Sequence, residues 1–215
     1  MSNLSALLQG ALTTVEVCAL AVILGSVLGV LLAVAFQSGS KLLQFLVRCQ
    51  VSFARGTPLF IQIMVIYFLL PALGIDIPRF YAGVIALGFN SSAYISEMIR
   101  GAILTIPPGQ VEAARALALP KRLIWAHITL PQVFALILPP LTVEFAALLK
   151  GSALLSVIGL VELTRTAQQV IGYSFAPITT WLQVGLLYFL MCYALAFATR
   201  YTQRMTSAYR PREAI

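Results

Sequence analysis

The sequence has few charged residues: Asp, Glu, Lys and Arg make up 10% of its 215 residues, whereas an ordinary soluble domain has about a quarter. It contains one histidine and three cysteines, and these do not form a cluster with carboxylates at metal-ligand spacing. It also lacks the G-x-x-x-x-G-K-[ST] motif of a nucleotide-binding loop and the H-E-x-x-H motif of a zinc protease. We therefore expect no metal site, no cofactor bound by this chain and no enzymatic activity.

Hydrophobic residues account for 60% of the chain, which is far above the soluble range. A helix needs about 20 apolar residues to cross a bilayer core. The sequence therefore predicts a single all-α domain, a polytopic membrane protein with five transmembrane helices over about residues 12–36, 58–73, 80–101, 130–150 and 178–203. The first ten residues carry no Lys or Arg and no cleavage site follows, so we expect the first helix to remain in the protein.

The basic residues indicate the orientation, because Lys and Arg collect on the cytoplasmic side of a membrane protein. If the N-terminus lies outside, only Arg79, Lys150 and Arg165 among the fourteen basic residues fall in outer segments. This orientation places residues 107–120 inside. The net charge of +7 then follows from topology, and we expect a lipid bilayer rather than a nucleic acid as the environment.

The segment 107–131 is the one long stretch that combines charge with good helix formers. Proline is tolerated in the first helical turn, so Pro108 is expected to open a helix that runs to about Leu119. Within this helix, Glu112 and Arg115 are spaced for an ion pair. Two interpretations remain open from the pattern alone: an amphipathic helix on the membrane surface, or a docking helix for another protein.

Polar residues inside the predicted spans indicate a buried polar site. Residues 88–92 (GFNSS) include Asn90 and predict a polar pocket with locally flexible backbone. Gln62 in the second span could face a transport path or form an interhelical hydrogen bond. Glu97 and Arg100 are three residues apart, which favours a structural ion pair.

Two carboxylates lie toward the predicted outer side. Glu144 follows a Pro-Pro pair inside the fourth span, where a carboxylate is costly unless it contacts water or a cation. Glu162 lies in the outer segment that follows. Together they could surround an ammonium group. The alternatives are a snorkelling Glu144 and an ordinary i, i+3 helix pair between Glu162 and Arg165.

The first predicted span and the segment after it carry packing and capping signals. Small residues recur at every fourth position and predict close approach of another helix: Ala21, Gly25, Gly29 and Ala33. Residues 37–53 are expected to form an inner loop. Thr57 is expected to cap the second span, with Pro58 at its first helical position.

Four blocks in order resemble the permease subunits of bacterial binding-protein-dependent ABC importers, and more narrowly the branch for polar amino acids of the HisMQ type. They are RGTP at 55–58, AYISEMIRG at 93–101, the EAA segment beginning at Glu112, and PPLTVEFAALLKGSALLSVIG at 139–159. The EAA segment departs from the family at Ala118, where glycine is usual. Because alanine does not readily adopt positive φ, we expect a more helical turn there.

The resemblance implies a type I ABC importer permease fold, with a cytoplasmic coupling helix over 107–120 and a multi-pass location in the bacterial inner membrane. It implies that an ATPase subunit dimer binds ATP and Mg, and that the permease pairs with itself or a similar permease. It also implies a periplasmic or extracellular amino-acid-binding protein. The residues implied in ATPase coupling are Glu112, Ala113, Ala114 and Ala118. The candidate substrate-binding residues are Glu144, Glu162, Asn90 and Gln62. The alternative function is a passive membrane channel or scaffold subunit.

Overall fold

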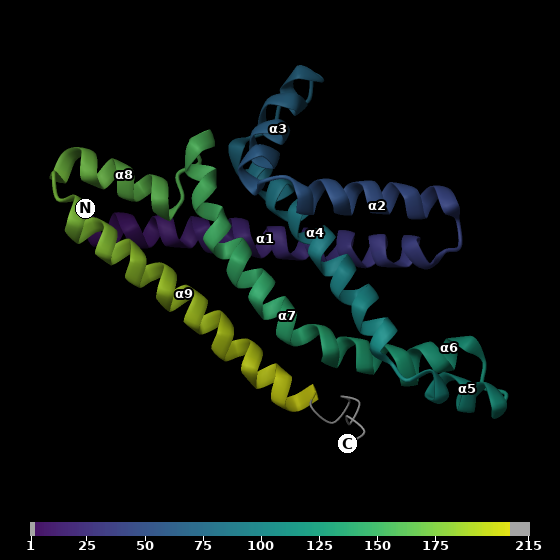
Figure 1. Cartoon of the computed structure of the whole chain (residues 1–215). Helices are drawn as coiled ribbons and strands as arrows, with labels where there is room; N and C mark the ends of the chain where they lie inside the picture. Colours follow the sequence, from purple (N-terminus) through teal and green to yellow (C-terminus); the bar gives the residue numbers. More distant parts are fainter. Residues whose placement is uncertain (1–2, 207–215) are drawn as a thin grey trace.

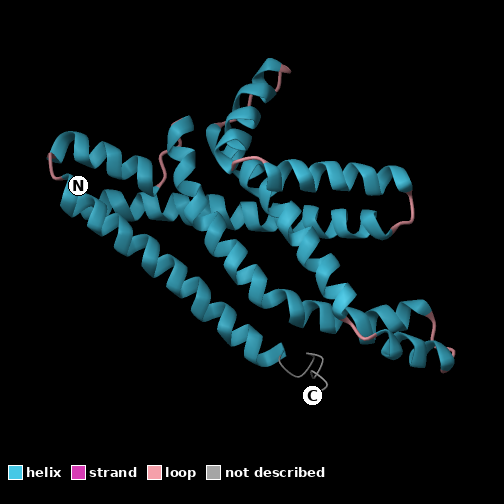
Figure 2. Cartoon of the chain, viewed as in Figure 1, coloured by secondary structure: helices cyan, strands magenta, loops and turns pink. Residues whose placement is uncertain are grey.

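The computed structural model describes residues 3–206, and every regular element within them is helical (Figure 2). This confirms the all-α prediction. Arg210 and Arg212, two of the predicted inner basic residues, lie outside the described range. The elements in order are α1 (Asn3–Gln37), α2 (Lys41–Gly56), α3 (Leu59–Ala72), α4 (Arg79–Thr105), α5 (Pro108–Ala116), α6 (Lys121–Ile124), the π-helical turn η1 (Trp125–Thr129), α7 (Leu130–Gly151), the 3-10 helix η2 (Ser152–Ile158), α8 (Leu163–Ser174) and α9 (Pro177–Thr206).

The stripe of small residues on α1 packs against α4, as predicted. All four of its residues are buried. A Cβ atom added to Gly25 would lie 3.1 Å from the Gly88 carbonyl oxygen, and one added to Gly29 would lie 2.7 Å from Cγ2 of Ile95. The two helices cross in Figure 1 at this close contact. Glycine is needed on α1 here because the space for a side chain is already filled by α4.

The hydrophobic core lies where α1, α4, α7 and η2 meet, around Val17, Leu87, Leu148 and Leu155. A second cluster joins the start of α1 to α8 and α9, around Leu7, which is fully buried. Many apolar side chains outside these clusters remain exposed along α1 and α9. Exposed apolar surface on this scale is what a lipid environment or partner helices would cover.

Three helical stretches within the described residues are long and apolar enough to cross a membrane: Asn3–Gln37, Lys121–Ile158 and Pro177–Thr202. A fourth arises if α2 and α3, which meet at a bend of 115°, are counted as one broken span. Helix α3 has only 14 residues, and α4 carries its polar run together with Glu97 and Arg100. Five spans and an outer N-terminus therefore remain predictions.

Two predictions about the region before the second span were wrong. Residues 37–53 do not form a loop, because most of them lie in α2, which runs back alongside α1 (Figure 1). Ser40 caps this helix by accepting a hydrogen bond from the Leu43 amide. Thr57 ends α2 instead of starting α3, and its hydroxyl donates to the Phe53 carbonyl at 2.8 Å. The basic residues of this segment lie on an amphipathic helix.

The predicted flexible backbone at residues 88–92 was also wrong, because α4 is an unbroken helix through this stretch. The Ser92 hydroxyl donates to the Phe89 carbonyl at 2.7 Å. One turn later the Ser96 hydroxyl donates to the Ala93 carbonyl at 2.8 Å. A serine hydroxyl can donate a hydrogen bond to a backbone carbonyl of the preceding helical turn in this way. The polar side chains therefore do not need irregular backbone.

Candidate functional site

A cavity of about 220 Å³ lies between α3, α4 and α7. It places Glu144 from α7 with Asn90 from α4, as the predicted polar pocket requires. The remaining lining residues are Leu59, Leu87, Ser91, Tyr94, Ala147 and Leu148. Glu144 is the only charged residue among them, so we call this cavity the Glu144 pocket. Its chemistry is that of one carboxylate, an amide and two hydroxyl groups on apolar walls.

Gln62 lies behind the wall of this pocket and holds Asn90 in place. Its side chain is 1% exposed, and its amide nitrogen donates to the carbonyls of Ala54 at 2.8 Å and Thr57 at 3.0 Å. Its amide oxygen accepts a hydrogen bond from Asn90 Nδ2 at 3.1 Å. Asn90 Nδ2 also donates to the Ala54 carbonyl at 3.2 Å. Of the two interpretations left open by the sequence, this geometry is that of an interhelical hydrogen bond.

Ser91 is a pocket residue that the sequence did not single out as a site residue. It is 1% exposed, and its hydroxyl lies beside the Glu144 carboxyl. That hydroxyl interacts with the Glu144 carboxyl, but it does not reach full hydrogen-bond geometry with any of the described residues. A polar ligand bound at Glu144 could therefore bond to Ser91 as well. The pair of serines after Asn90 was the available sequence signal.

Glu162 lies outside the lining of the Glu144 pocket, so the structure does not bring the two predicted carboxylates into one cavity. Its carboxylate caps α8, accepting from the amides of Thr164 at 2.9 Å and Arg165 at 2.8 Å. It also accepts from the Tyr188 hydroxyl on α9 at 3.1 Å. The Arg165 guanidinium donates a hydrogen bond to Gln168 Oε1 at 3.0 Å and does not pair with the Glu162 carboxylate. The alternative of an i, i+3 ion pair between Glu162 and Arg165 is therefore wrong.

Burial is the main influence on the electrostatics of Glu162, whose side chain is fully buried. Desolvation disfavours the carboxylate and raises the pKa of Glu162. The two backbone amides and the Tyr188 hydroxyl oppose this shift, because they stabilise the ionised form. The arrangement joins the start of α8 to α9 and gives the side chain a structural task.

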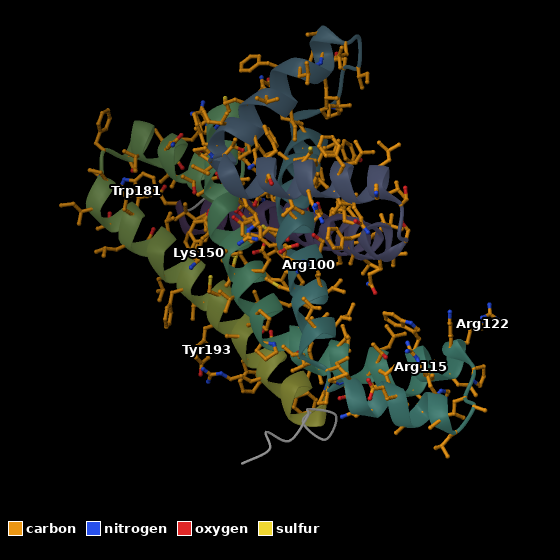
Figure 3. All side chains as sticks on the ribbon, turned by 45° about the vertical axis from the view of Figure 1, so that its right-hand side comes forward. Arg100, Arg115, Arg122, Lys150, Trp181 and Tyr193 are labelled. Carbon is orange, nitrogen blue, oxygen red and sulfur yellow. The ribbon has the colours of Figure 1, made fainter. Side chains whose placement is uncertain are left out.

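The predicted ion pair on α4 is confirmed. Arg100 donates to both carboxylate oxygens of Glu97, at 2.9 Å and 2.6 Å, and Arg55 from α2 lies 3.7 Å from the same carboxylate. The Arg55 guanidinium also lies over the ring of Tyr94, 5.8 Å from its centroid. Because Tyr94 lines the Glu144 pocket, this charged cluster adjoins the pocket. Arg100, one of its members, is labelled on α4 in Figure 3.

Helix α5 projects with α6 from one end of the helical assembly (Figure 1). Of the predicted coupling residues, Glu112, Ala113 and Ala118 are exposed, whereas Ala114 is buried against the rest of the chain. Glu112 and Arg115 do not form the expected ion pair, because the ion pairs among the described residues all involve Glu97. The surface of α5 therefore offers small side chains and an unpaired carboxylate to a neighbour.

The turn after α5 corrects the prediction for Ala118. The helix ends at Ala116 rather than near residue 119, and Ala118 has φ of 58°. The Leu119 amide donates to the Ala114 carbonyl at 3.1 Å, and the Ala118 amide donates to the Arg115 carbonyl at 2.9 Å. These two bonds form a Schellman motif, which requires a left-handed residue at this position. The two backbone bonds thus hold alanine in the conformation that glycine adopts more easily.

The comparison with known families identifies the chain. Residues 25–207 match the family described as "Binding-protein-dependent transport system inner membrane component". The chain belongs to this family. The resemblance inferred from the EAA segment and its neighbouring blocks is therefore confirmed.

Known members of this permease family resemble the chain over nearly its whole length. The arginine transport system permease protein ArtQ of Bacillus subtilis (strain 168) is 36% identical over 199 residues, 92% of this chain and 91% of that protein. The glutamine transport system permease protein GlnP of Escherichia coli (strain K12) is 34% identical over 200 residues, 92% of this chain and 91% of that protein.

A solved permease structure shares the fold. It is described as "Crystal structure of an amino acid ABC transporter with histidines", with a TM-score of 0.87 and 34% sequence identity. The match covers 95% of this chain and 99% of that chain. The helices described above therefore have the fold of an ABC transporter permease.

Proposed function

We propose that this permease is the membrane-spanning subunit of an ATP-driven importer that moves polar amino acids into the cytoplasm by alternating access. The observation that carries the proposal is the Glu144 pocket, which places a carboxylate, an amide and a buried hydroxyl beside one another between three packed helices. The relatives named for arginine and glutamine transport support the substrate class. The bacterial inner membrane is the location that fits this function.

The chemistry of the pocket suits the polar end of an amino acid. Glu144 would accept the ammonium group or a basic side chain, because a carboxylate in an apolar setting favours a cation. Asn90 and Ser91 would bond to the remaining polar atoms. At about 220 Å³, the pocket is smaller than the 300–1,000 Å³ of typical ligand sites. Glu144, Asn90 and Ser91 line the pocket, so we assign direct contact to them. Gln62 lies behind the wall and bonds to Asn90, so we assign it a positioning role. Glu162 would have no direct contact with the substrate, and its role would be to cap the start of α8.

The energy source would lie on another chain. We propose that α5 is the coupling helix and that Glu112, Ala113 and Ala118 on its exposed surface dock into an ATPase subunit, which binds ATP and Mg²⁺. The buried Ala114 would fix α5 against its own bundle. The assembly would contain two permease copies or two similar permeases, two ATPase subunits and an external amino-acid-binding protein. This arrangement requires residues 107–120 on the cytoplasmic side.

The test is amino-acid uptake by the complex reconstituted with its ATPase and binding protein. All twenty amino acids are screened first, and the best substrate is then measured with Glu144→Gln. A charged hydrogen bond contributes about 1.5–3 kcal/mol, so the KM for uptake should rise about ten- to a hundredfold. Assembly with the ATPase should not change. Glu16→Gln is the matched control, because Glu16 is exposed on α1 and does not line the pocket.

Two results would contradict the proposal. Unchanged uptake by the Glu144→Gln complex would remove Glu144 from the substrate site. Uptake that proceeds down a gradient without ATP hydrolysis would indicate the passive channel considered from the sequence. A loss of assembly in the variant would show a structural effect, and it would be detected by copurification of the ATPase before uptake is measured.

A further inference from the structure

Two cavities meet beside the coupling segment, away from the Glu144 pocket. The larger has a volume of about 540 Å³ and lies between the end of α1, the end of α4 and the start of α7. Its lining is apolar except for Gln37 and Ser38: Val30, Ala33, Val34, Ile99, Ile103, Trp125, Leu130, Val133, Phe134 and Ile137. Several of these side chains are exposed, including Val34 at 61% and Phe134 at 54%.

The smaller cavity has a volume of about 330 Å³ and lies between α4, α5, α6 and η1. It contains two cationic side chains, Arg115 from α5 and Lys121 from α6. Ile103 and Trp125 line both cavities, so the two adjoin at these side chains. We call the whole the amphipathic groove: an apolar half within the helical bundle and a cationic half under the coupling helix.

The two cations in the groove form no ion pair with the residues that the structure describes. The ion pairs among the described residues involve Glu97 with Arg55 and Arg100, and they leave out Arg115 and Lys121. Trp125 stands where the apolar and cationic halves join, and it is 39% exposed. Tryptophan is enriched at membrane interfaces, where one end of the ring meets hydrocarbon and the other meets headgroups.

We propose that the amphipathic groove binds an anionic phospholipid of the inner leaflet. Its phosphate would lie between Arg115 and Lys121, and an acyl chain would run along the apolar half past Ile103. Charge complementarity selects this occupant, because an apolar helix from another protein would fill the larger half and leave both cations without a partner. The cytoplasmic leaflet supplies anionic lipid at this depth, so the inference rests on the proposed inner position of α5. The bound lipid would join the coupling helix to the bundle.

The first test counts bound lipids by native mass spectrometry of the purified permease–ATPase complex. Phosphatidylglycerol and phosphatidylcholine with the same acyl chains are added in parallel, and phosphatidylglycerol should bind preferentially. Removing one of the two cations with Lys121→Gln should weaken phosphatidylglycerol binding about fivefold. Arg122→Gln removes the same charge from the neighbouring position, which does not line the groove and projects outward in Figure 3. It should leave binding unchanged.

The second test addresses the apolar half. Val34→Trp would fill the space that the acyl chain needs, because Val34 lines the groove. Leu31→Trp places the same ring on an exposed position of α1 outside the lining. We expect Val34→Trp alone to reduce the number of retained phosphatidylglycerol molecules. Both variants change exposed positions, so the complex should keep its subunit composition, which the same spectra report.

Several results would overturn the proposal. Equal retention of the two lipids, or equal effects of Lys121→Gln and Arg122→Gln, would show that the cationic half does not select the headgroup. Complete displacement of the lipid by glycerol phosphate would identify an anion site without an acyl-chain site. Lipid bound only to complexes that lack a second permease copy would make the groove a protein interface. Lipid counts do not depend on transport, so this proposal and the proposed function fail separately.

Discussion

The turn that closes the coupling helix permits a quantitative prediction for Ala118→Gly. A non-glycine residue in the left-handed region costs roughly 1–2 kcal/mol. Substitution by glycine removes this cost, but glycine has more conformational freedom in the unfolded chain. Losing that freedom offsets about 0.4–1 kcal/mol of the stabilisation. The substitution should therefore stabilise the turn by about 1 kcal/mol, because φ of 58° is already set by two backbone hydrogen bonds.

Hydrogen exchange followed by mass spectrometry measures this effect locally. A stabilisation of about 1 kcal/mol should slow exchange of the amides of Ala118 and Leu119 about fivefold. Ala116→Gly is the matched control with the opposite sign, because Ala116 is the last residue of α5 and glycine within a helix costs about 0.5–1 kcal/mol. Equal or faster exchange in Ala118→Gly than in the unchanged protein would refute the left-handed assignment and the strain inferred from it.

Three further predictions follow from contacts within the bundle. Gly29→Leu should lower the unfolding temperature in detergent, because overpacking against Ile95 costs about 1–3 kcal/mol, whereas Gly185→Leu, at an open position on α9, should not. Gln62→Leu should raise the KM for uptake with little change in kcat, because it removes the oxygen that orients Asn90; an unchanged KM would contradict the positioning role. Burial raises the pKa of Glu162 above 4.5, so the folded state binds the proton more tightly than the unfolded state and stability should fall as pH rises from about 4.5 through the folded-state pKa. Thermal unfolding across this range should show the fall, Glu162→Gln should reduce it, and an equal slope in both proteins would contradict the assignment.

The sequence predicted the helical class and the family because these depend on composition and on short blocks of contiguous residues. It also predicted that another helix packs closely on the small residues of α1, since small residues at every fourth position favour such contact, but it did not identify that helix as α4. The same local approach failed for α2. Residues 37–53 were expected to form a loop, whereas Arg48 lies over the ring of Phe36, with 5.5 Å from its guanidinium carbon to the ring centroid, as part of an amphipathic helix.

The candidate site was predicted only in part, because its geometry is set by contacts between distant segments. Glu144 and Glu162 look alike in sequence, but one lines a cavity and the other caps a helix. Gln62 could be assigned only once Asn90, on a different helix, was seen to bond to it. Ser91 was missed as a site residue because nothing local shows that its hydroxyl, unlike that of Ser92, completes no bond within its own helix.

The glycine contacts between α1 and α4 also constrain how this permease can move. The Gly88 carbonyl oxygen of α4 lies 3.1 Å from the place where a Cβ on Gly25 would stand, so no side chain separates the two helices at this point. We expect the pair to move as a single block during a change of shape. Its Asn90 and Ser91 are fixed to that block, whereas Glu144 belongs to α7. Relative displacement of α7 would thus pull apart the two halves of the pocket and release whatever they hold.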